Sequence, residues 1–401
     1  MTHKLTIRDI DFSNQKVLLR VDFNVPLEDG EIADDARIRA SVPTIQYIIE
    51  HGGSIILMSH LGRPKGRKDS KLSLQPCASR LSEIIGMPVK MAPDCRGPQT
   101  AKMAVELKKG EILLLENLRF HKGEEKPQEE PEFVTALAGM GTVYVDDAFG
   151  SAHRAHASIT SIAQFFPNQS VMGFLMEKEV AYLGSILTKP KRPFCALLGG
   201  AKISTKFKVI EALMQKADTL LIGGAMAFTF FKAQDIAVGD SLVENDFLPV
   251  ARQLMDVSVQ SRCRLLLPVD IVAVSGDKTI TVSINEGIPS SYKGVDIGPQ
   301  TVERYKKEIQ KSKTIFWNGP LGIFECPPFD KGTNAIAEAM AEMKDKADTI
   351  VGGGDSAFAL ENAGLVDKMS HVSTGGGASL EFIEFGTLPG IEALTNSPYA
   401  K

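Results

Sequence analysis

Short and nearly continuous hydrophobic runs recur in the first 160 residues, and polar residues follow each of them. The runs cover residues 17–21, 54–58, 112–115 and 142–145. Between them, residues 37–51 and 74–85 carry apolar side chains at three- and four-residue spacing, which predicts helices. Strands that are apolar on both faces and alternate with helices are typical of a parallel sheet covered on both sides. The pattern therefore predicts an α/β domain in this half.

The second half repeats this pattern, but glycines follow its hydrophobic runs. These runs cover residues 194–198, 219–222, 314–317, 349–351 and 371–374. Strand, glycine-rich turn and helix follow one another each time, so a second parallel α/β domain is expected. The predicted fold is two Rossmann-like, doubly wound parallel-sheet domains, with residues 1–170 in the first and 188–387 in the second.

The segment between the halves has a helical pattern over residues 171–187, and prolines at positions 190 and 193 follow it. A helix bounded in this way between two α/β halves predicts a bridge and a hinge. The alternative is an ordinary crossover helix inside one domain.

Composition supports two domains and excludes several protein classes. The 401 residues exceed the size of one hydrophobic core, and the net charge of −4 argues against nucleic-acid binding. The five cysteines form no C-x-x-C pair, so neither a disulfide framework nor a zinc site is expected. No run of about 18 apolar residues and no signal-peptide pattern occur. A soluble protein of the reducing cytoplasm is expected.

Basic and polar residues cluster after the strands of the first half, where ligands bind in parallel sheets. The candidates are Asp22, Asn24, Arg37, His60, Arg63, Arg119 and Arg154. Arginines that converge on one rim repel each other unless an anion neutralises them, so the pattern predicts a site for a small polyanion. The alternative for each arginine alone is a solvated surface charge. His153 and His156 are expected to hydrogen-bond the backbone.

The stretch 349–356 carries the clearest candidate chemistry of the second half. A strand should end at three glycines, and a helix should begin near Ser356 and point its N–H groups at an anion such as phosphate. Asp355 could hold a metal ion. A second helix start after Gly377 offers a similar cradle. Lys202 and Lys206 are four residues apart, which predicts that they share one helical face.

Known nucleotide motifs narrow the choice for this domain. The Walker A sequence is absent, so a P-loop enzyme is excluded. Gly352, Gly354 and Ala357 match the dinucleotide pattern G-x-G-x-x-A, but no acidic residue ends a strand about 20 residues later. A nicotinamide dehydrogenase and a non-enzymatic sugar-phosphate sensor stay open as rival functions.

Taken together, these motifs resemble the phosphoglycerate kinase family over nearly the whole chain. The matching stretches are 20–26, 59–64, 116–120, 146–156, 199–202, 317–320, 352–356 and 373–379. The resemblance implies reversible phosphoryl transfer between 1,3-bisphosphoglycerate and ADP, giving 3-phosphoglycerate and ATP, with Mg²⁺, in glycolysis and gluconeogenesis. It also implies a monomer whose tail, residues 388–401, packs on the first domain.

The resemblance further implies roles for individual residues. It assigns the polar cluster of the first half to phosphoglycerate, and Arg37, Lys202 and Gly376 to the phosphoryl group in flight. Gly294 would lie near the base, Glu325 on the ribose and Asp355 on the metal ion. The full nucleotide set is Lys202, Lys206, Gly224, Gly294, Asn318, Glu325, Gly353, Gly354, Asp355 and Ser356.

One departure from the family pattern lies at Gly223-Gly224-Ala225, where three glycines are common, and the extra methyl group should narrow the adenine slot. Because phosphoryl transfer depends mainly on positioning and charge neutralisation, we expect direct in-line transfer without a phosphoenzyme. Closure of the domains would exclude water.

Overall fold

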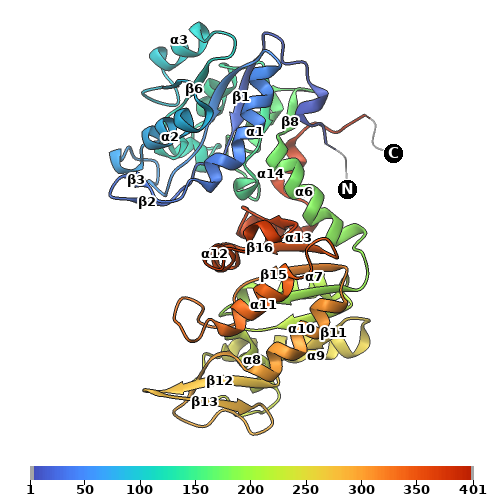
Figure 1. Ribbon diagram of the computed structural model, residues 1–401. Coiled ribbons are helices and arrows are strands. Elements are labelled where there is room, and N and C mark those ends of the chain that lie inside the picture. The colour runs from blue at the N-terminus through green and yellow to red at the C-terminus, as the bar shows by residue number, and fades with distance from the viewer. Residues whose placement is uncertain (1–3, 399–401) are drawn as a thin grey trace. The chain divides into compact units, whose positions relative to one another are not determined.

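The computed structural model describes residues 4–398 and divides the chain into two compact units. One unit contains residues 4–181 together with 387–398, and the other is Tyr182–Gly386. Figure 1 shows a sheet with helices on its faces in each unit. We describe the two units separately as unit 1 and unit 2.

Unit 1 is built on a six-stranded sheet in which all paired strands are parallel. Its strands are β1 (Lys16–Arg20), β4 (Ser54–Met58), β5 (Val89–Met91), β6 (Ile112–Leu114), β7 (Val143–Asp146) and β8 (Ser170–Met172), in the order β5-β6-β4-β1-β7-β8. Arg20, the last residue of β1, lies between Met58 of β4 and Asp146 of β7. The four predicted strands are present, and the two short edge strands β5 and β8 were not predicted.

The helices of unit 1 follow from local sequence signals. They are α1 (Ala36–Glu50), α2 (Gln75–Ile85), α3 (Pro98–Glu106), α4 (Lys122–Glu125), α5 (Pro131–Ala138) and α14 (Pro389–Ala393). A proline in the first turn starts α2, α3, α5 and α14, where its missing N–H costs no hydrogen bond. Ile38, Ile45 and Ile48 of α1 pack with Leu81 of α2 in one core against the strands. A hairpin of β2 (Leu27–Glu28) and β3 (Glu31–Ile32) precedes α1.

Unit 2 contains a second six-stranded parallel sheet, and its strand order is that of a Rossmann fold. The strands are β9 (Phe194–Leu198), β10 (Thr219–Ile222), β11 (Arg264–Leu266), β15 (Thr314–Asn318), β16 (Asp348–Gly352) and β17 (His371–Val372), in the order β11-β10-β9-β15-β16-β17. The chain runs outward from β9 to one edge, returns, and continues from β15 to the other edge. The switch point is therefore the gap between β9 and β15.

Helices cover both faces of this sheet. Side chains of α10 (Pro299–Lys311), α11 (Lys331–Ala341) and α12 (Gly354–Asn362) share one core with strand residues such as Trp317. The remaining helices are α7 (Phe207–Met214), α8 (Met226–Ala233), α9 (Leu248–Gln260) and α13 (Gly377–Phe385), and α7 contacts both α9 and α13. The predicted doubly wound fold is confirmed in both units.

A small antiparallel sheet in unit 2 was not predicted. It consists of β12 (Asp270–Ser275), β13 (Lys278–Ser283) and β14 (Lys293–Ile297), in the order β13-β12-β14. Its signal was present in the sequence, because two β-branched stretches flank the two-residue turn Gly276-Asp277. The sheet matters because β12 and β14 line the larger of the two cavities described below.

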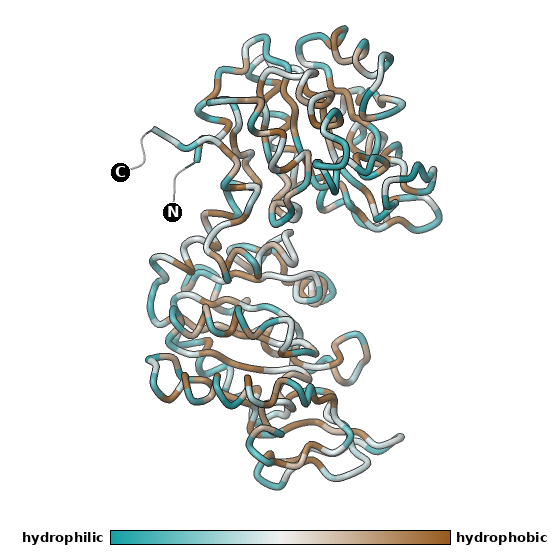
Figure 2. The backbone as a smooth tube through the Cα atoms, turned by 180° about the vertical axis from the view of Figure 1, so that it is seen from behind, coloured by the Kyte–Doolittle hydropathy of each residue, from teal (hydrophilic) through white to brown (hydrophobic). Residues whose placement is uncertain are grey.

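The connecting helix differs from its prediction at the N-terminal end. Residues 170–172 form strand β8, and helix α6 runs over Phe174–Thr188, so the first two residues of the predicted helix belong to the sheet. Val171 is buried in the core of unit 1 and its N–H and C=O groups pair with β7, which outweighs its place in a helical pattern. Among residues 4–398, no helix is long and apolar enough to cross a membrane. Figure 2 shows hydrophobic residues along the strands of both units.

Candidate active site

The polar residues of unit 1 lie beyond the carboxyl ends of β1, β4 and β6, as the sheet topology requires. Asp22 is nearly buried, and Arg37 Nη1 donates to its Oδ2 at 2.6 Å. Arg37 lies in the first turn of α1, within the helix predicted over residues 37–51. Asn24 Oδ1 accepts from the Gly62 N–H at 2.8 Å, which ties the loop after β1 to the loop after β4. These bonds join three neighbouring segments at one rim.

His60 is held from beneath by a buried polar network. Arg20 is fully buried, and its Nη2 lies 3.0 Å from His60 Nδ1 while its Nε donates to Ser158 Oγ at 2.8 Å. The Ser158 hydroxyl donates to the fully buried Glu124 carboxylate at 2.7 Å. Burial, and then the charges of Arg20, Arg119 and Arg37, lower the pKa of His60 well below its ordinary value. The imidazole is therefore neutral near pH 7.

The lowered pKa values of His60 and of a second histidine, His156, show that several arginines lie near these two rings. Arg119 donates to the Gly62 carbonyl at 3.0 Å and lies 3.5 Å from Glu125. Burial, followed by the charges of Arg119, Arg20 and Arg154, lowers the pKa of His156 to about 3. His156 Nδ1 lies 3.9 Å from the Glu124 carboxylate. The cationic residues thus converge on one region of unit 1, which is the condition for binding a polyanion.

Two of the predicted residues stand apart from these contacts. Arg63 and Arg154 are exposed, and within residues 4–398 neither side chain forms a hydrogen bond or ion pair that ties it to the rim. Arg154 is connected with the rim only through its charge acting on His156. Exposed guanidinium groups of this kind are free to turn toward an incoming anion.

In unit 2, a half-buried lysine occupies the switch point between β9 and β15. Lys206 Nζ donates to the Gly199 carbonyl at 2.7 Å and to the Asn318 side-chain oxygen at 2.6 Å. The Asn318 amide donates in turn to the Gly352 carbonyl at 2.7 Å. Burial lowers the pKa of Lys206 to about 8, and the nearby Asp355 carboxylate opposes this shift. Lys206 and Asn318 together therefore join the ends of three strands.

The glycine-rich stretch forms the expected strand, turn and helix. The helix α12 begins at Gly354, two residues before the predicted start near Ser356. Gly353 has φ of +96°, and a Cβ there would lie 2.7 Å from the Asn318 amide nitrogen, so only glycine fits this turn. Ser356 is buried, and its Oγ accepts from the Gly319 N–H at 2.6 Å. A cavity of about 220 Å³ lies here, and Lys206, Asn318, Gly353, Gly354, Asp355, Ser356, Gly376 and Gly377 line it.

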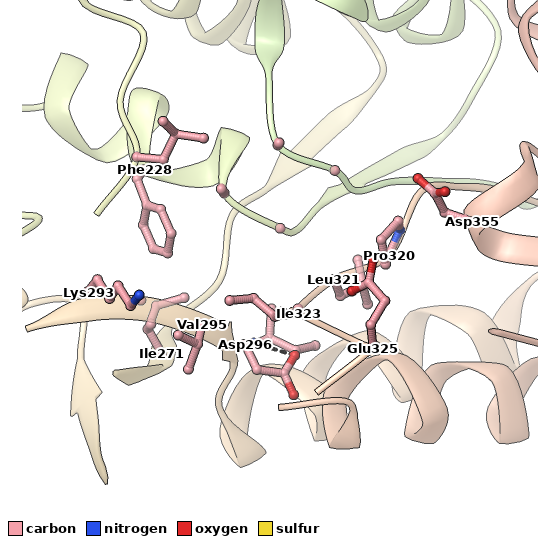
Figure 3. A pocket seen from close by; sticks show the side chains of 18 of the residues that line it. Phe228, Ile271, Lys293, Val295, Asp296, Pro320, Leu321, Ile323, Glu325 and Asp355 are labelled. Carbon is pink, nitrogen blue, oxygen red and sulfur yellow. Dashed lines mark hydrogen bonds between the residues drawn. The ribbon is translucent and has the colours of Figure 1, made fainter. Parts of the chain in front are cut away.

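A larger cavity of about 490 Å³ lies beside the switch point, within the size range of small-molecule sites. Phe228, Ile271, Val295, Leu321 and Ile323 give it an apolar lining, as Figure 3 shows. A Cβ on Gly294 would lie 2.1 Å from Phe228 Cζ, so glycine lets this ring pack against β14. Gly224 and Ala225 also line the cavity, so the methyl group of Ala225 borders the space that it was predicted to narrow.

Charged side chains also border this cavity: Asp240, Asp296, Glu325 and Asp355 carry carboxylates, and Lys293 carries an ammonium group. Glu325 and Asp355 are seen together in Figure 3, and Lys293 lies on the opposite side. Asp355 lines both cavities. One exposed carboxylate beside a phosphate cradle suits Mg²⁺, which is commonly held by one or two carboxylates and the phosphates of the substrate. The residues present therefore fit the metal ion that the resemblance implies.

The prediction that Lys202 and Lys206 share a helical face is wrong. Lys202 precedes a 3₁₀ turn, η6 (Ile203–Thr205), and Lys206 precedes α7. The irregular turn separates the two side chains, so Lys206 is half-buried whereas Lys202 is exposed and lines neither cavity. The spacing rule assumes one continuous helix, and the chain bends between the two lysines.

Comparisons with known proteins agree on one family. The family described as phosphoglycerate kinase matches residues 7–385. A protein named phosphoglycerate kinase from Chloroherpeton thalassium is 50% identical over 398 residues, covering 98% of this chain and all of the relative. Its namesake from Chloroflexus aurantiacus is 53% identical over 402 residues, with the same coverage. A solved phosphoglycerate kinase structure from Coxiella burnetii has a TM-score of 0.86 at 38% identity and covers 97% of this chain. That from Pyrococcus horikoshii has a TM-score of 0.84 at 33% identity.

Proposed function

The chain belongs to the phosphoglycerate kinase family and is a phosphotransferase, and from that premise we propose that it interconverts 1,3-bisphosphoglycerate and ADP with 3-phosphoglycerate and ATP. The observation that carries the proposal is the division of chemistry between the units. Unit 1 gathers Arg20, Arg37 and Arg119 around His60. Unit 2 has a cavity with an apolar lining beside glycine-rich helix starts. The first arrangement suits a small polyanion and the second a nucleotide.

In this proposal, the acceptor binds at the rim of unit 1. Arg37, Arg63, Arg119 and Arg154 would neutralise its phosphate and carboxylate groups, since guanidinium groups bind such anions through paired hydrogen bonds. Asn24 and Asp22 would contact the hydroxyl group. Asp22 Oδ2 already accepts from Arg37 at 2.6 Å, so it would also orient this arginine toward the acceptor.

The nucleotide would bind in unit 2. The base would occupy the apolar cavity near Gly294 and Ala225, with Glu325 on the ribose. The phosphates would reach the N-terminal ends of α12 and α13, where N–H groups and the positive helix ends favour anions. Asp355 would hold Mg²⁺, which, when bound, neutralises part of the phosphate charge. Lys206 would hold the switch point open for the phosphates through its bonds to Gly199 and Asn318.

The transfer itself would be direct and in line. Arg37, Lys202 and the backbone N–H groups near Gly376 would stabilise the charge on the phosphoryl group as it moves, and no side chain would become phosphorylated. Because both substrates must meet, we propose that the two units close during turnover, with α6 as the hinge, and that closure excludes water. Trapping a covalently phosphorylated residue during turnover would contradict direct transfer.

The proposal includes a monomer that works in the cytoplasm. The five cysteines are all free thiols, and four of them are buried. A reducing compartment maintains such thiols without oxidation.

The test is a coupled assay with ATP, Mg²⁺ and 3-phosphoglycerate that follows NADH oxidation through glyceraldehyde-3-phosphate dehydrogenase. We expect turnover by the wild-type protein. Arg37→Ala should lower kcat by at least about a hundredfold and leave the KM for ATP nearly unchanged, because the guanidinium acts mainly on the transferred charge. A loss confined to the KM for 3-phosphoglycerate would show that Arg37 only anchors the acceptor.

Two control variants replace residues that lie close in sequence to those under test. Arg39→Ala removes an exposed arginine that pairs with Asp35, two residues from Arg37, and should leave kcat within about twofold. Lys202→Ala should also lower kcat, because its ammonium group acts on the transferred charge in this proposal. Lys208→Ala is its control, because Lys208 pairs with Glu384 on α13. A folded wild-type protein that binds MgADP but shows no turnover would direct the search to other phosphorylated carboxylates.

A further inference from the structure

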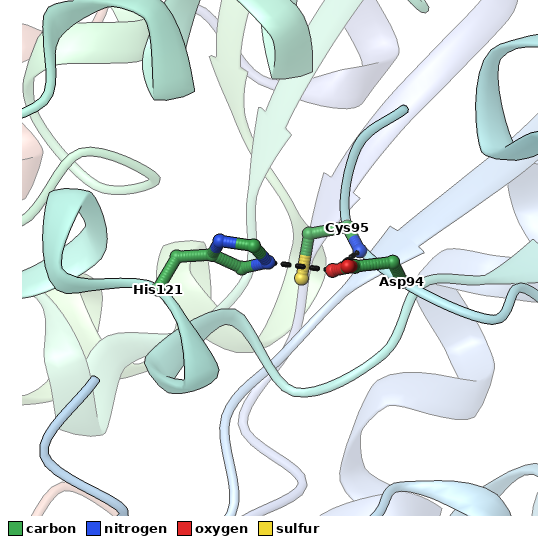
Figure 4. Close-up of side chains that lie close together, drawn as sticks. All are labelled: Asp94, Cys95 and His121. Atoms are coloured by element: carbon green, nitrogen blue, oxygen red, sulfur yellow. Dashed lines mark hydrogen bonds and ion pairs between the residues drawn. The ribbon is translucent and has the colours of Figure 1, made fainter. Parts of the chain in front are cut away.

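Three side chains that commonly bind transition metals meet in unit 1, beyond the carboxyl ends of β5 and β6. Asp94 and Cys95 follow strand β5, and His121 follows the 3₁₀ turn η3 (Leu118–Phe120). One possible ligand atom from each residue lies within 4.8 Å of the other two. Figure 4 shows the imidazole, the thiol and the carboxylate turned toward one another. The sequence alone did not predict this group, because 26 positions separate Cys95 from His121.

Hydrogen bonds already hold these atoms in place. His121 Nε2 lies 2.5 Å from Asp94 Oδ1, and the Cys95 thiol lies 2.8 Å from the carbonyl oxygen of Glu116. Cys95 is fully buried, whereas the Asp94 side chain is 44% exposed. An ion would therefore reach the thiol from the side of the carboxylate.

The supporting contacts limit how far the three side chains can turn. The His121 ring stacks on Phe133 with centroids 5.1 Å apart, and its backbone N–H donates to the Leu118 carbonyl at 3.1 Å. The Thr100 hydroxyl donates to the Asp94 carbonyl at 3.1 Å. Outer contacts of this kind orient metal ligands and raise affinity, because less conformational freedom is lost on binding.

The surrounding charge favours a cation. Burial raises the pKa of the Cys95 thiol, the negative charges of Asp94, Glu124 and Glu116 add to this shift, and the positive charge of Arg96 opposes it. Arg96 itself is paired with Glu130 at 2.6 Å. The local excess of carboxylate charge would attract a divalent ion.

We propose that Asp94, Cys95 and His121 form a binding site for a divalent cation of the zinc class. The ligands would be one thiolate, one imidazole nitrogen and one carboxylate oxygen, a combination that suits Zn²⁺ or Co²⁺ and excludes Mg²⁺. The thiol would release its proton to solvent on binding, and the ion would replace the hydrogen bond between His121 and Asp94. Water or the Glu116 carbonyl oxygen would complete a tetrahedral site.

The site is separate from the Mg²⁺ position proposed at Asp355 and does not depend on the proposed function. It lies close in sequence to the acceptor rim, because His121 is two residues beyond Arg119. A bound ion would join the loop after β5 to the segment 116–121, and thereby make unit 1 harder to unfold.

The test uses Co²⁺ as the probe, added to the full-length protein without nucleotide and with excess Mg²⁺ to occupy sites made only of oxygen ligands. We expect one equivalent of Co²⁺ to produce thiolate-to-cobalt charge-transfer absorption and to raise the unfolding temperature. Cys95→Ser should abolish this absorption. His121→Gln should weaken Co²⁺ binding by at least about tenfold and retain the absorption at saturation.

The control is Cys326→Ser, which removes the exposed cysteine of unit 2 and should leave the titration unchanged. Absence of charge-transfer absorption in the wild-type protein would overturn the proposal, as would absorption that disappears in Cys326→Ser instead. If Cys95→Ser does not fold, His121→Gln and Asp94→Asn decide the question. Wild-type affinity in both of these variants would also overturn the proposal.

Discussion

At the residue scale, the contact between Arg20 and His60 determines which ring nitrogen of His60 carries the proton, and the sequence could not show this. A guanidinium group has only donors, so at 3.0 Å from Arg20 the Nδ1 atom of His60 must accept. The proton of the neutral ring therefore lies on Nε2. In the proposed function, Arg20 is a positioning residue. Its contact with Nδ1 leaves the Nε2–H group of His60 as a donor to the phosphoglycerate substrate.

This assignment predicts the tautomer of His60 in solution. Selective ¹⁵N labelling of histidines at a pH of about 6.5, the ordinary pKa of histidine, should show a neutral His60 ring with its proton on Nε2. The ring is neutral at this pH because burial and the nearby arginines lower its pKa. His51 provides an internal comparison. Its Nδ1 lies 2.8 Å from the Tyr47 carbonyl, which can only accept, so Nδ1 must carry a proton. Loss of one signal set in His60→Gln assigns the spectrum, and a protonated His60 Nδ1 at neutral pH would contradict the interpretation.

At the element scale, the N-terminus of α6 depends on a buried carboxyl group. Asp147 is fully buried after β7, and its Oδ1 accepts from the Met176 N–H at 3.0 Å. A Cβ on Gly173 would lie 2.3 Å from this side chain, so glycine allows the close approach. Burial raises the pKa of Asp147 to about 7, and hydrogen bonds from Thr44, Met176 and Leu175 oppose the shift. The start of the proposed hinge helix is thus coupled to pH.

The sign of this coupling gives a second prediction. Between about pH 4 and 7 the folded protein holds a proton on Asp147 that the unfolded chain has lost, so this group stabilises the fold at low pH and the contribution disappears as pH rises through 7. Asp147→Asn cannot ionise. The stability difference between wild type and variant, measured by urea unfolding at pH 5 and 8, should therefore shift in favour of the variant by up to roughly 3 kcal/mol. A difference that is independent of pH would show that Asp147 is ionised throughout.

At the scale of the whole molecule, the end of the chain belongs to the unit that contains its beginning. The Thr395 N–H donates to the Ser170 carbonyl at 2.9 Å, and the Leu5 N–H donates to the Thr395 carbonyl at 2.9 Å. Leu388, Ile391 and Leu394 are buried. Residues 399–401 of the predicted tail lie outside the described residues. Residues after Gly386 thus complete the core of unit 1, although they follow the last helix of unit 2.

Removing residues 387–401 should destabilise unit 1 selectively. Three buried apolar side chains are lost, which costs about 4.5–9 kcal/mol at ~1.5–3 kcal/mol each, and residual burial in the unfolded chain reduces this cost. The single tryptophan, Trp317, is fully buried in unit 2 and reports on that unit alone. We expect the far-ultraviolet circular dichroism signal to lose part of its amplitude at lower urea, while the tryptophan transition stays near its wild-type midpoint. Equal shifts of both transitions would show that the units unfold together.

The sequence by itself determined the two parallel α/β domains and most of the residues at their strand ends. Long apolar runs such as 54–58 are stable only as strands of a sheet that helices cover on both faces. Because the strands are parallel, the polar residues that follow them meet at one edge of the sheet. The resemblance to one family, carried by motifs that follow one another in order, identified the same residues. Short edge strands such as β8 were missed, because three residues carry little periodicity.

Only the tertiary structure decided features that depend on contacts between distant residues. Arg20 lies within the hydrophobic run 17–21 and no role was predicted for it, but its complete burial makes it the group that orients His60. Lys202 and Lys206 looked equivalent, but the turn between them leaves Lys206 half-buried and Lys202 exposed. Asp94, Cys95 and His121 carry no common motif and meet only because β5 and β6 are neighbours. Periodicity encodes which elements form, whereas burial and the partners of a side chain arise only when the elements pack.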